Sequence, residues 1–157
     1  MGFWQRFAGS EEPQHKDPQQ LVPILVTSCR AEKQLTQQIL AHAELAPHQA
    51  GRDQLRTAAE EQERTTQRIQ DKIAELEGEW SETEEASPKG GHNHWSRVVH
   101  DLEDSQTLTQ RYNEQAIYWD PDLPDATQFF LSLERDKRRL NAFLRDIALR
   151  ADPHAVD

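Results

Sequence analysis

The feature that most constrains the fold is the spacing of apolar residues, which recurs every three or four positions along four long stretches. This spacing places the apolar side chains on one face of an α-helix. It predicts helices at about 20–45, 48–80, 94–119 and 126–150, and long alternating runs of β-branched residues, typical of strands, are absent. An amphipathic helix buries its apolar face only against other elements. The sequence therefore predicts an all-α four-helix bundle.

The connections between these stretches limit the topology. The first and third connections are short and contain proline, so each is expected to join two antiparallel neighbours. The middle connection, 81–93, combines Gly, Ser, Pro and charged residues and would reach about 43 Å when extended. A helix of about 26 residues spans about 39 Å. The connection can therefore cross the bundle and make the second and third helices parallel. The same residues could instead form a loose loop in a simple up-down bundle, so the length alone leaves both topologies open.

The bundle is expected to occupy residues 19–151 as a single domain, which suits the length of 157 residues. The polar, proline-containing residues 1–18 predict a flexible tail, and residues 152–157 a short C-terminal tail. Asp125 is the expected N-cap of the last helix.

An aromatic tip distinguishes the first tail. Phe3, Trp4 and Phe7 would share one face of a short helical turn. Such a tip could dock on a protein partner, or fold back on its own bundle or on a second copy in a homo-oligomer. Three aromatic residues with one Arg make only a weak membrane anchor.

Charge and composition exclude several classes of partner. The net charge of −10 disfavours nucleic acids and anionic membranes. No apolar run approaches the roughly 20 residues of a transmembrane helix, and no secretory signal is evident. A single cysteine, Cys29, cannot form an internal disulfide and is expected to be a buried thiol. These features together favour a cytoplasmic location.

Three short patches place polar residues among the inward positions of the predicted helices. They are Glu32 with Ile39, Gln62-x-x-Thr65 with Ile69 and the closing Leu76-Glu77-Gly78, and Asp136-x-x-Arg139 with Phe143. In this pattern the chain, over about residues 21–150, resembles the ferritin-like proteins of the bacterioferritin and rubrerythrin kind. That family has a metal-binding Glu in the first patch and Glu-x-x-His in the other two. The resemblance implies a ferritin-like bundle with a crossover between the second and third helices.

The resemblance also implies that the di-iron ligands have degenerated. Such a site uses a Glu from each of two helices and Glu-x-x-His from the other two. Thr65 and Arg139 stand in place of the two histidines, and Gln62 is neutral. Glu32 is retained and Asp136 is a shorter carboxylate. The remaining ligand, on the third helix, would be Glu103, with Asp101 and His100 as weaker alternatives.

Arg139 is the most informative change, because a guanidinium stays charged and cannot bind a metal ion. The hypothesis is that a buried polar cluster replaces the metal. Its members would be Glu32, Gln62, Thr65, Asp136 and Arg139.

Other alignments of the motif lack histidine too. Glu60-x-x-Glu63 and Glu134-x-x-Lys137 are alternatives, and both are expected to face away from the apolar stripe. His42 lies on the inner face and is expected to be a satisfied core histidine rather than a metal ligand.

These observations predict a non-catalytic structural or protein-binding module without a cofactor. No Gly-rich phosphate loop, nucleophile–base arrangement or cysteine cluster is present, so no catalytic residue is assigned. One alternative is a metal protein of the di-iron oxidase, peroxidase or iron-storage type, holding iron or manganese through Glu32, Glu103 and Asp136. Another is a generic helical interaction module.

Overall fold

The computed structural model describes residues 16–82, 87, 88 and 90–157, and in these residues it contains helices and no strand. Four long helices follow a short 3-10 turn. The elements are η2 (Pro18–Gln20), α1 (Leu21–Leu45), α2 (Gln49–Glu75), α3 (His94–Trp119) and α4 (Pro124–Arg150). The predicted all-α bundle is confirmed.

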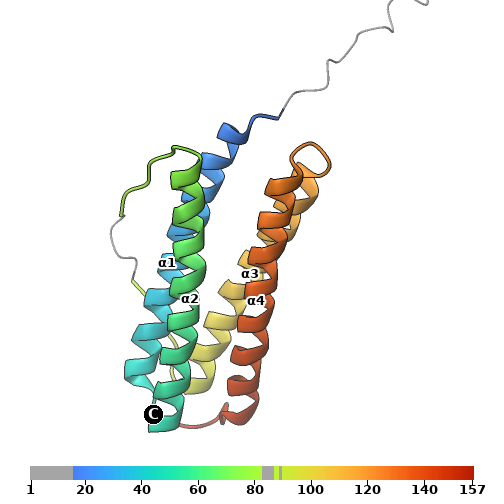
Figure 1. The fold of residues 1–157 in the computed structure, drawn as a ribbon. Helices are drawn as coiled ribbons and strands as arrows, with labels where there is room; N and C mark the ends of the chain where they lie inside the picture. The colour runs from blue at the N-terminus through green and yellow to red at the C-terminus, as the bar shows by residue number, and fades with distance from the viewer. Residues whose placement is uncertain (1–15, 83–86, 89) are drawn as a thin grey trace, which may run out of the picture.

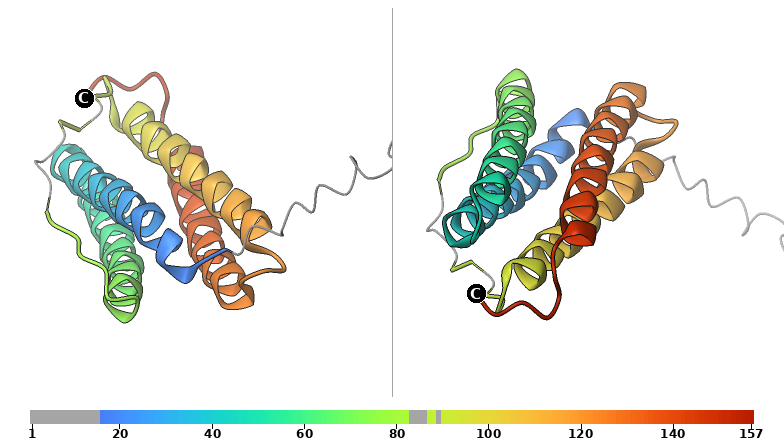
Figure 2. Two further views of the ribbon diagram at one scale, coloured as in Figure 1. Left: turned by 90° about the horizontal axis from the view of Figure 1, so that it is seen from above. Right: turned by 90° about the horizontal axis from the view of Figure 1, so that it is seen from below.

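The helices form two antiparallel pairs that pack side by side. α1 pairs with α2, and α3 pairs with α4 (Figure 1). Seen along the bundle, α1 lies beside α3 and α2 beside α4 (Figure 2). α2 ends at the opposite end of the bundle from the start of α3, so these two helices run parallel. The crossover is therefore confirmed, because the connection between them traverses the length of the bundle.

The described parts of this connection rest on α1. Lys33 Nζ lies 4.2 Å above the centre of the Trp80 ring, and it forms an ion pair of 3.0 Å with Glu82. Further along, Ser87 and Pro88 line a pocket with residues of α1 and α3. The described parts of the crossover thus lie on the α1–α3 face of the bundle.

The core is built from the predicted stripes of all four helices. Its fully buried side chains include Leu25, Cys29, Ile39, Leu55, Ile69, Ile73, Val98, Phe130, Leu133 and Leu144. The prediction of a buried Cys29 thiol is confirmed. Burial raises the pKa of this thiol, which disfavours the reactive thiolate.

α2 ends at Glu75, five residues before the predicted boundary at residue 80. The amide of Gly78 donates to the carbonyl of Ile73, and the amide of Glu77 donates to that of Ala74, which is the Schellman arrangement. Glu77 occupies the left-handed position with φ of 58°. That position usually holds Gly, so the end of the helix carried no clear signal in the sequence.

Replacing Glu77 by Gly is expected to raise the free energy of unfolding by about 1 kcal/mol, because only Gly adopts positive φ without a steric penalty. Urea unfolding of the variant measures the gain. Glu77→Ala removes the same charge and keeps the strain, so it should show no comparable gain. Equal stabilisation by both substitutions would mean that the side chain, and not the backbone, carries the cost.

α4 begins at Pro124, and its N-cap is Leu123, which forms no side-chain capping bond. The expectation that Asp125 caps this helix is wrong. Pro at the first position needs no amide partner and has the φ angle of a helix, so it starts α4 without a polar cap. Asp125 lies instead in the first turn, where its charge is favourable.

Both chain ends lie on the bundle where they are described. Lys16 forms an ion pair of 2.9 Å with Asp122, and Pro18 belongs to η2 rather than to a tail. The aromatic tip Phe3/Trp4/Phe7 lies outside the described residues. At the other end, the Asn93 side chain donates to the carbonyls of Pro153 and Ala155, which holds the C-terminal residues against the start of α3. Within the described residues, no helix is long and apolar enough to cross a membrane.

Candidate functional site

A buried carboxylate lies at the centre of the bundle. Glu32 projects from the middle of α1, and its exposed fraction is 0%. Each of the other three helices directs one polar side chain to it. The Nζ atom of Lys137 lies 2.7 Å from Oε2, Gln62 Nε2 donates to Oε2 at 2.6 Å, and the Tyr112 hydroxyl donates to Oε1 at 2.6 Å. We call these four residues the central cluster.

The central cluster contains a full ion pair in the protein interior. The Lys137 side chain has an exposed fraction of 0%, like that of Glu32. Burial lowers the pKa of Lys137, while the neighbouring Glu32 charge raises it and so opposes loss of the proton. Burial and the Glu32 charge hold the pKa of Tyr112 well above its usual value, so the phenol remains a neutral donor. The Lys137 cation thus balances the charge of the carboxylate, and the Gln62 amide and the Tyr112 hydroxyl donate hydrogen bonds to it.

These residues do not fit a di-iron centre. Such a centre needs several carboxylates and imidazoles with free lone pairs. The central cluster offers one carboxylate, one amide and one phenol, and the ammonium group lies where it would repel a metal cation. Across the part of the chain that the structure describes, no group of three or more His, Cys, Asp or Glu residues could hold a metal ion.

The cluster predicted from the sequence is only partly present. Glu32 and Gln62 are buried together, as expected. Arg139 is not buried: its side chain is 74% exposed and pairs with Asp136 at the surface. Thr65 is buried, and its hydroxyl donates to Asp136 at 3.4 Å rather than to the central carboxylate. The prediction of a buried guanidinium is therefore wrong, because the buried cation is Lys137.

The register of α4 explains this correction. Leu133, Lys137 and Leu140 face the core at spacings of four and three, so Asp136 and Arg139 lie to one side of that stripe. The expectation that Glu134-x-x-Lys137 faces outward is wrong, because both of these residues are buried. In this frame Lys137 occupies the histidine position of Glu-x-x-His. Glu134 accepts hydrogen bonds from Arg138 and Asn113.

The helix α2 frame is as predicted. Gln62 and Thr65 face inward, whereas the alternative pair Glu60 and Glu63 is exposed. The neutral Gln62 amide donates to the Glu32 carboxylate, which a glutamate at this position could not do when ionised.

The expectation that Glu103 is the ligand on α3 is wrong. Its side chain is 64% exposed and lies 3.7 Å from His100 at the surface. Asp101 is fully buried, but its partners are the His42 ring, at 2.9 Å from Nδ1, and the Gln38 amide. Burial raises the pKa of Asp101, and the contacts with His42 and Gln38 oppose the shift. His42 is a satisfied core histidine, as predicted.

Two members of the central cluster, Tyr112 and Lys137, were not predicted from the sequence. Nothing in the sequence indicated that the Tyr112 hydroxyl meets Glu32. The one available signal for Lys137 was its position within the apolar stripe of α4. A lysine there requires a buried counter-ion, since an unpaired buried charge is very costly.

Comparison with known proteins establishes the fold. No family model matches the sequence, and no curated protein matches it. Among solved structures, a dodecameric thioferritin related to bacterioferritin, from Bacteroides fragilis, superposes with a TM-score of 0.74 at 17% identity, covering 84% of this chain and 86% of that one. A mycobacterial bacterioferritin gives a TM-score of 0.73 at 16% identity, with 84% of each chain covered.

A more distant neighbour has the same architecture. The Dps protein of Thermosynechococcus elongatus gives a TM-score of 0.63 at 11% identity, covering 89% of this chain and 99% of that one. At these identities the likeness concerns the fold. The chain therefore has a ferritin-like four-helix fold, as its sequence motifs indicated.

Proposed function

We propose that this chain is a ferritin-like bundle without a di-iron centre, and that it acts as a non-catalytic structural or protein-binding module. The observation that carries the proposal is the 2.7 Å ion pair between Lys137 and Glu32. In this ion pair the Lys137 ammonium group, rather than a bound metal ion, balances the charge of the Glu32 carboxylate. A metal ion would have to displace a buried ammonium group from its counter-ion.

The surroundings of the central cluster support the same proposal. Gln62 and Thr65 form part of the wall of a pocket between α2 and α4, together with Arg64, Arg68 and Arg139. Three guanidinium groups outnumber the two carboxylates of this pocket, Glu61 and Asp136, and this excess of positive charge disfavours the entry of a metal cation. A ferritin that takes up iron would benefit from the opposite charge.

Elemental analysis tests the proposal directly. Protein purified from cells supplied with iron and manganese is expected to contain far less than one equivalent of either metal per chain. Glu32→Ala should leave that low content unchanged, because no metal depends on the carboxylate. Stoichiometric iron or manganese that disappears in Glu32→Ala would overturn the proposal.

That contrary result would favour a second candidate, a ferritin-like metal protein of the storage, oxidase or peroxidase type. The similarity of the fold to a thioferritin and a bacterioferritin supports this second candidate. The ligand set Glu32, Glu103 and Asp136 does not support it, because Glu103 is exposed and Asp136 faces Arg68 and Arg139. A metal would need other donors.

Assembly is a further part of the proposal. One structural neighbour is described as dodecameric. We infer that this chain also forms a homo-oligomer, and light scattering of the purified chain would contradict this if it gave a monomeric mass. The crossover favours a ferritin-like origin over a generic helical module, because a simple up-down bundle has no such connection.

A further inference from the structure

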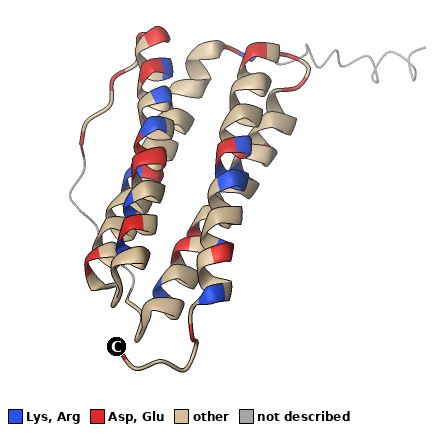
Figure 3. Ribbon diagram, turned by 60° about the horizontal axis from the view of Figure 1, so that its bottom comes forward, with Lys and Arg blue, Asp and Glu red and all other residues tan. Residues whose placement is uncertain are grey.

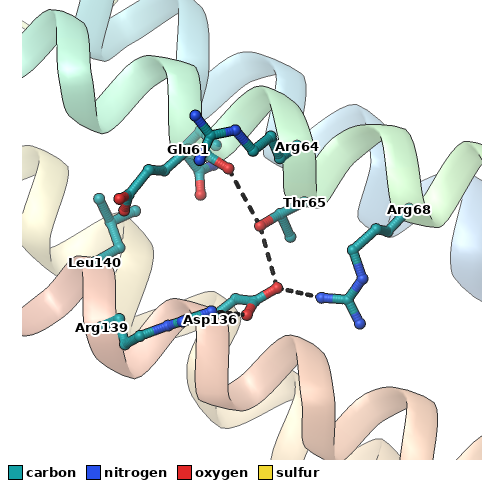
Figure 4. Close-up of a pocket in the computed structure, with 8 residues that line it drawn as sticks. Glu61, Arg64, Thr65, Arg68, Asp136, Arg139 and Leu140 are labelled. Atoms are coloured by element: carbon teal, nitrogen blue, oxygen red, sulfur yellow. Dashed lines mark hydrogen bonds and ion pairs between the residues drawn. The ribbon is translucent and has the colours of Figure 1, made fainter.

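A pocket of about 270 Å³ opens between α2 and α4, and it borders the central cluster only at Gln62. Five of its eight lining residues are charged. The residues around it are Glu61, Gln62, Arg64, Thr65, Arg68, Asp136, Arg139 and Leu140 (Figure 4). Three arginines face two carboxylates here, although the whole chain carries a net charge of −10. Figure 3 shows that basic and acidic positions are otherwise interspersed along α2 and α4.

Two helices supply the arginines from opposite sides. Arg64 and Arg68 are one turn apart on α2, so they share a face of that helix, and Arg139 comes from α4. Asp136 lies between them and pairs with both Arg68 and Arg139 (Figure 4). The pocket thus already holds one carboxylate of the protein, bound by two of these guanidinium groups.

Donors remain available around this internal carboxylate. Arg64 is exposed and forms no hydrogen bond or ion pair with any described residue. Arg139 uses one nitrogen for Asp136, at 2.5 Å, and is 74% exposed, so most of its five N–H donors face solvent. Arg68 has fewer free donors, because it donates hydrogen bonds to both Asp136 and Ser132.

We propose that the α2–α4 pocket binds a small oxyanion, with Arg64 and Arg139 as its principal ligands. Guanidinium groups match carboxylate and phosphate oxygens through paired, charge-assisted hydrogen bonds. The chemistry is shared by inorganic phosphate and by small dicarboxylates, and the pocket could take either. This site is independent of the absence of a metal in the central cluster.

Isothermal titration of the full chain with phosphate, and separately with malonate, tests the site at constant ionic strength set by chloride. Saturable binding of at least one of the two anions is expected. Arg64→Ala/Arg139→Ala should weaken that binding about tenfold or more, since two charge-assisted contacts are lost. Arg145→Ala, also an exposed arginine of α4 but outside the pocket, is the matched control and should bind as the wild type does.

Asp136→Asn gives a test of opposite sign. It removes the internal carboxylate that competes for Arg68 and Arg139, so the added anion should bind several-fold more tightly. A general loss of structure would weaken binding in both variants and could not produce this pair of results.

The outcomes distinguish the sources of the anion. Binding of phosphate alone assigns a phosphate group, and binding of malonate alone assigns a carboxylate ligand. The proposal is overturned if neither anion binds beyond the chloride control, or if Arg64→Ala/Arg139→Ala binds as tightly as the wild type. Equal weakening by Arg145→Ala would overturn it too, because net charge alone would then explain the effect.

Discussion

Replacing Glu32 by Gln is expected to lower the free energy of unfolding by about 3–5 kcal/mol. The substitution retains the shape of the side chain and its capacity to accept a hydrogen bond from Tyr112. It removes the charge that balances Lys137, which has an exposed fraction of 0%. A buried ammonium group without a counter-ion is the source of the loss. Urea denaturation at pH 7 measures it.

The loss should depend on pH in a defined direction. Burial lowers the pKa of Lys137, and Glu32 raises it, so removing the Glu32 charge leaves the pKa lower still. In the variant the folded chain then releases the Lys137 proton at a lower pH than the unfolded chain, whose lysine titrates near 10.4. Stability rises with pH wherever the unfolded state binds more protons. The deficit of Glu32→Gln relative to the wild type should therefore shrink between the pKa of Lys137 in the folded variant and its higher, though still lowered, pKa in the folded wild type.

A double-mutant cycle isolates the ion pair from other effects. Glu32→Gln/Lys137→Met removes both charges, and the double variant should be far more stable than Glu32→Gln alone. Arg139→Ala is the surface control, because its exposed pair with Asp136 should contribute no more than about 1 kcal/mol. Additive losses in the cycle, or a large loss in Arg139→Ala, would contradict the central role of Lys137.

Local periodicity was sufficient to predict the four helices, and the short first and third connections predicted their pairing. The stripes were read correctly because each stretch is long and its apolar spacing is regular. The end of α2 was missed because Glu77, rather than Gly, adopts the left-handed conformation there. The end of a helix depends on one or two backbone angles. When a residue other than Gly adopts the left-handed conformation there, the sequence carries no signal for the end.

The central cluster was harder to predict, because its members meet only in three dimensions. The motif frame on α2 placed Gln62 correctly, but the frame on α4 was displaced by two residues, from Glu134 to Asp136. The displaced frame has an apolar residue, Phe143, four positions after the motif, whereas the correct frame has Asn141 there. What the sequence could not show is that Lys137 has a partner on α1, which makes its burial tolerable.

The second large effect is a gain of metal binding. Gln62→Glu, Thr65→His and Lys137→His together would restore Glu-x-x-His on α2 and on α4, where Glu134 already precedes position 137 by three residues. Glu32 would then face carboxylate and imidazole ligands instead of an ammonium group. The triple variant is expected to bind a divalent metal such as Zn²⁺ or Fe²⁺. At a metal concentration of 100 times Kd, the stabilisation would be about 2.7 kcal/mol.

The informative control keeps the lysine. Gln62→Glu/Thr65→His adds a carboxylate and an imidazole but retains Lys137, whose ammonium group lies 2.7 Å from Glu32. This double variant should bind metal at least tenfold more weakly than the triple variant, and adding Glu32→Ala to the triple variant should abolish binding. If the double variant binds metal as well as the triple one, the Lys137 ammonium group does not exclude the ion. If the triple variant binds metal and the double variant does not, a single ammonium group is sufficient to keep a metal ion out of the centre of this bundle.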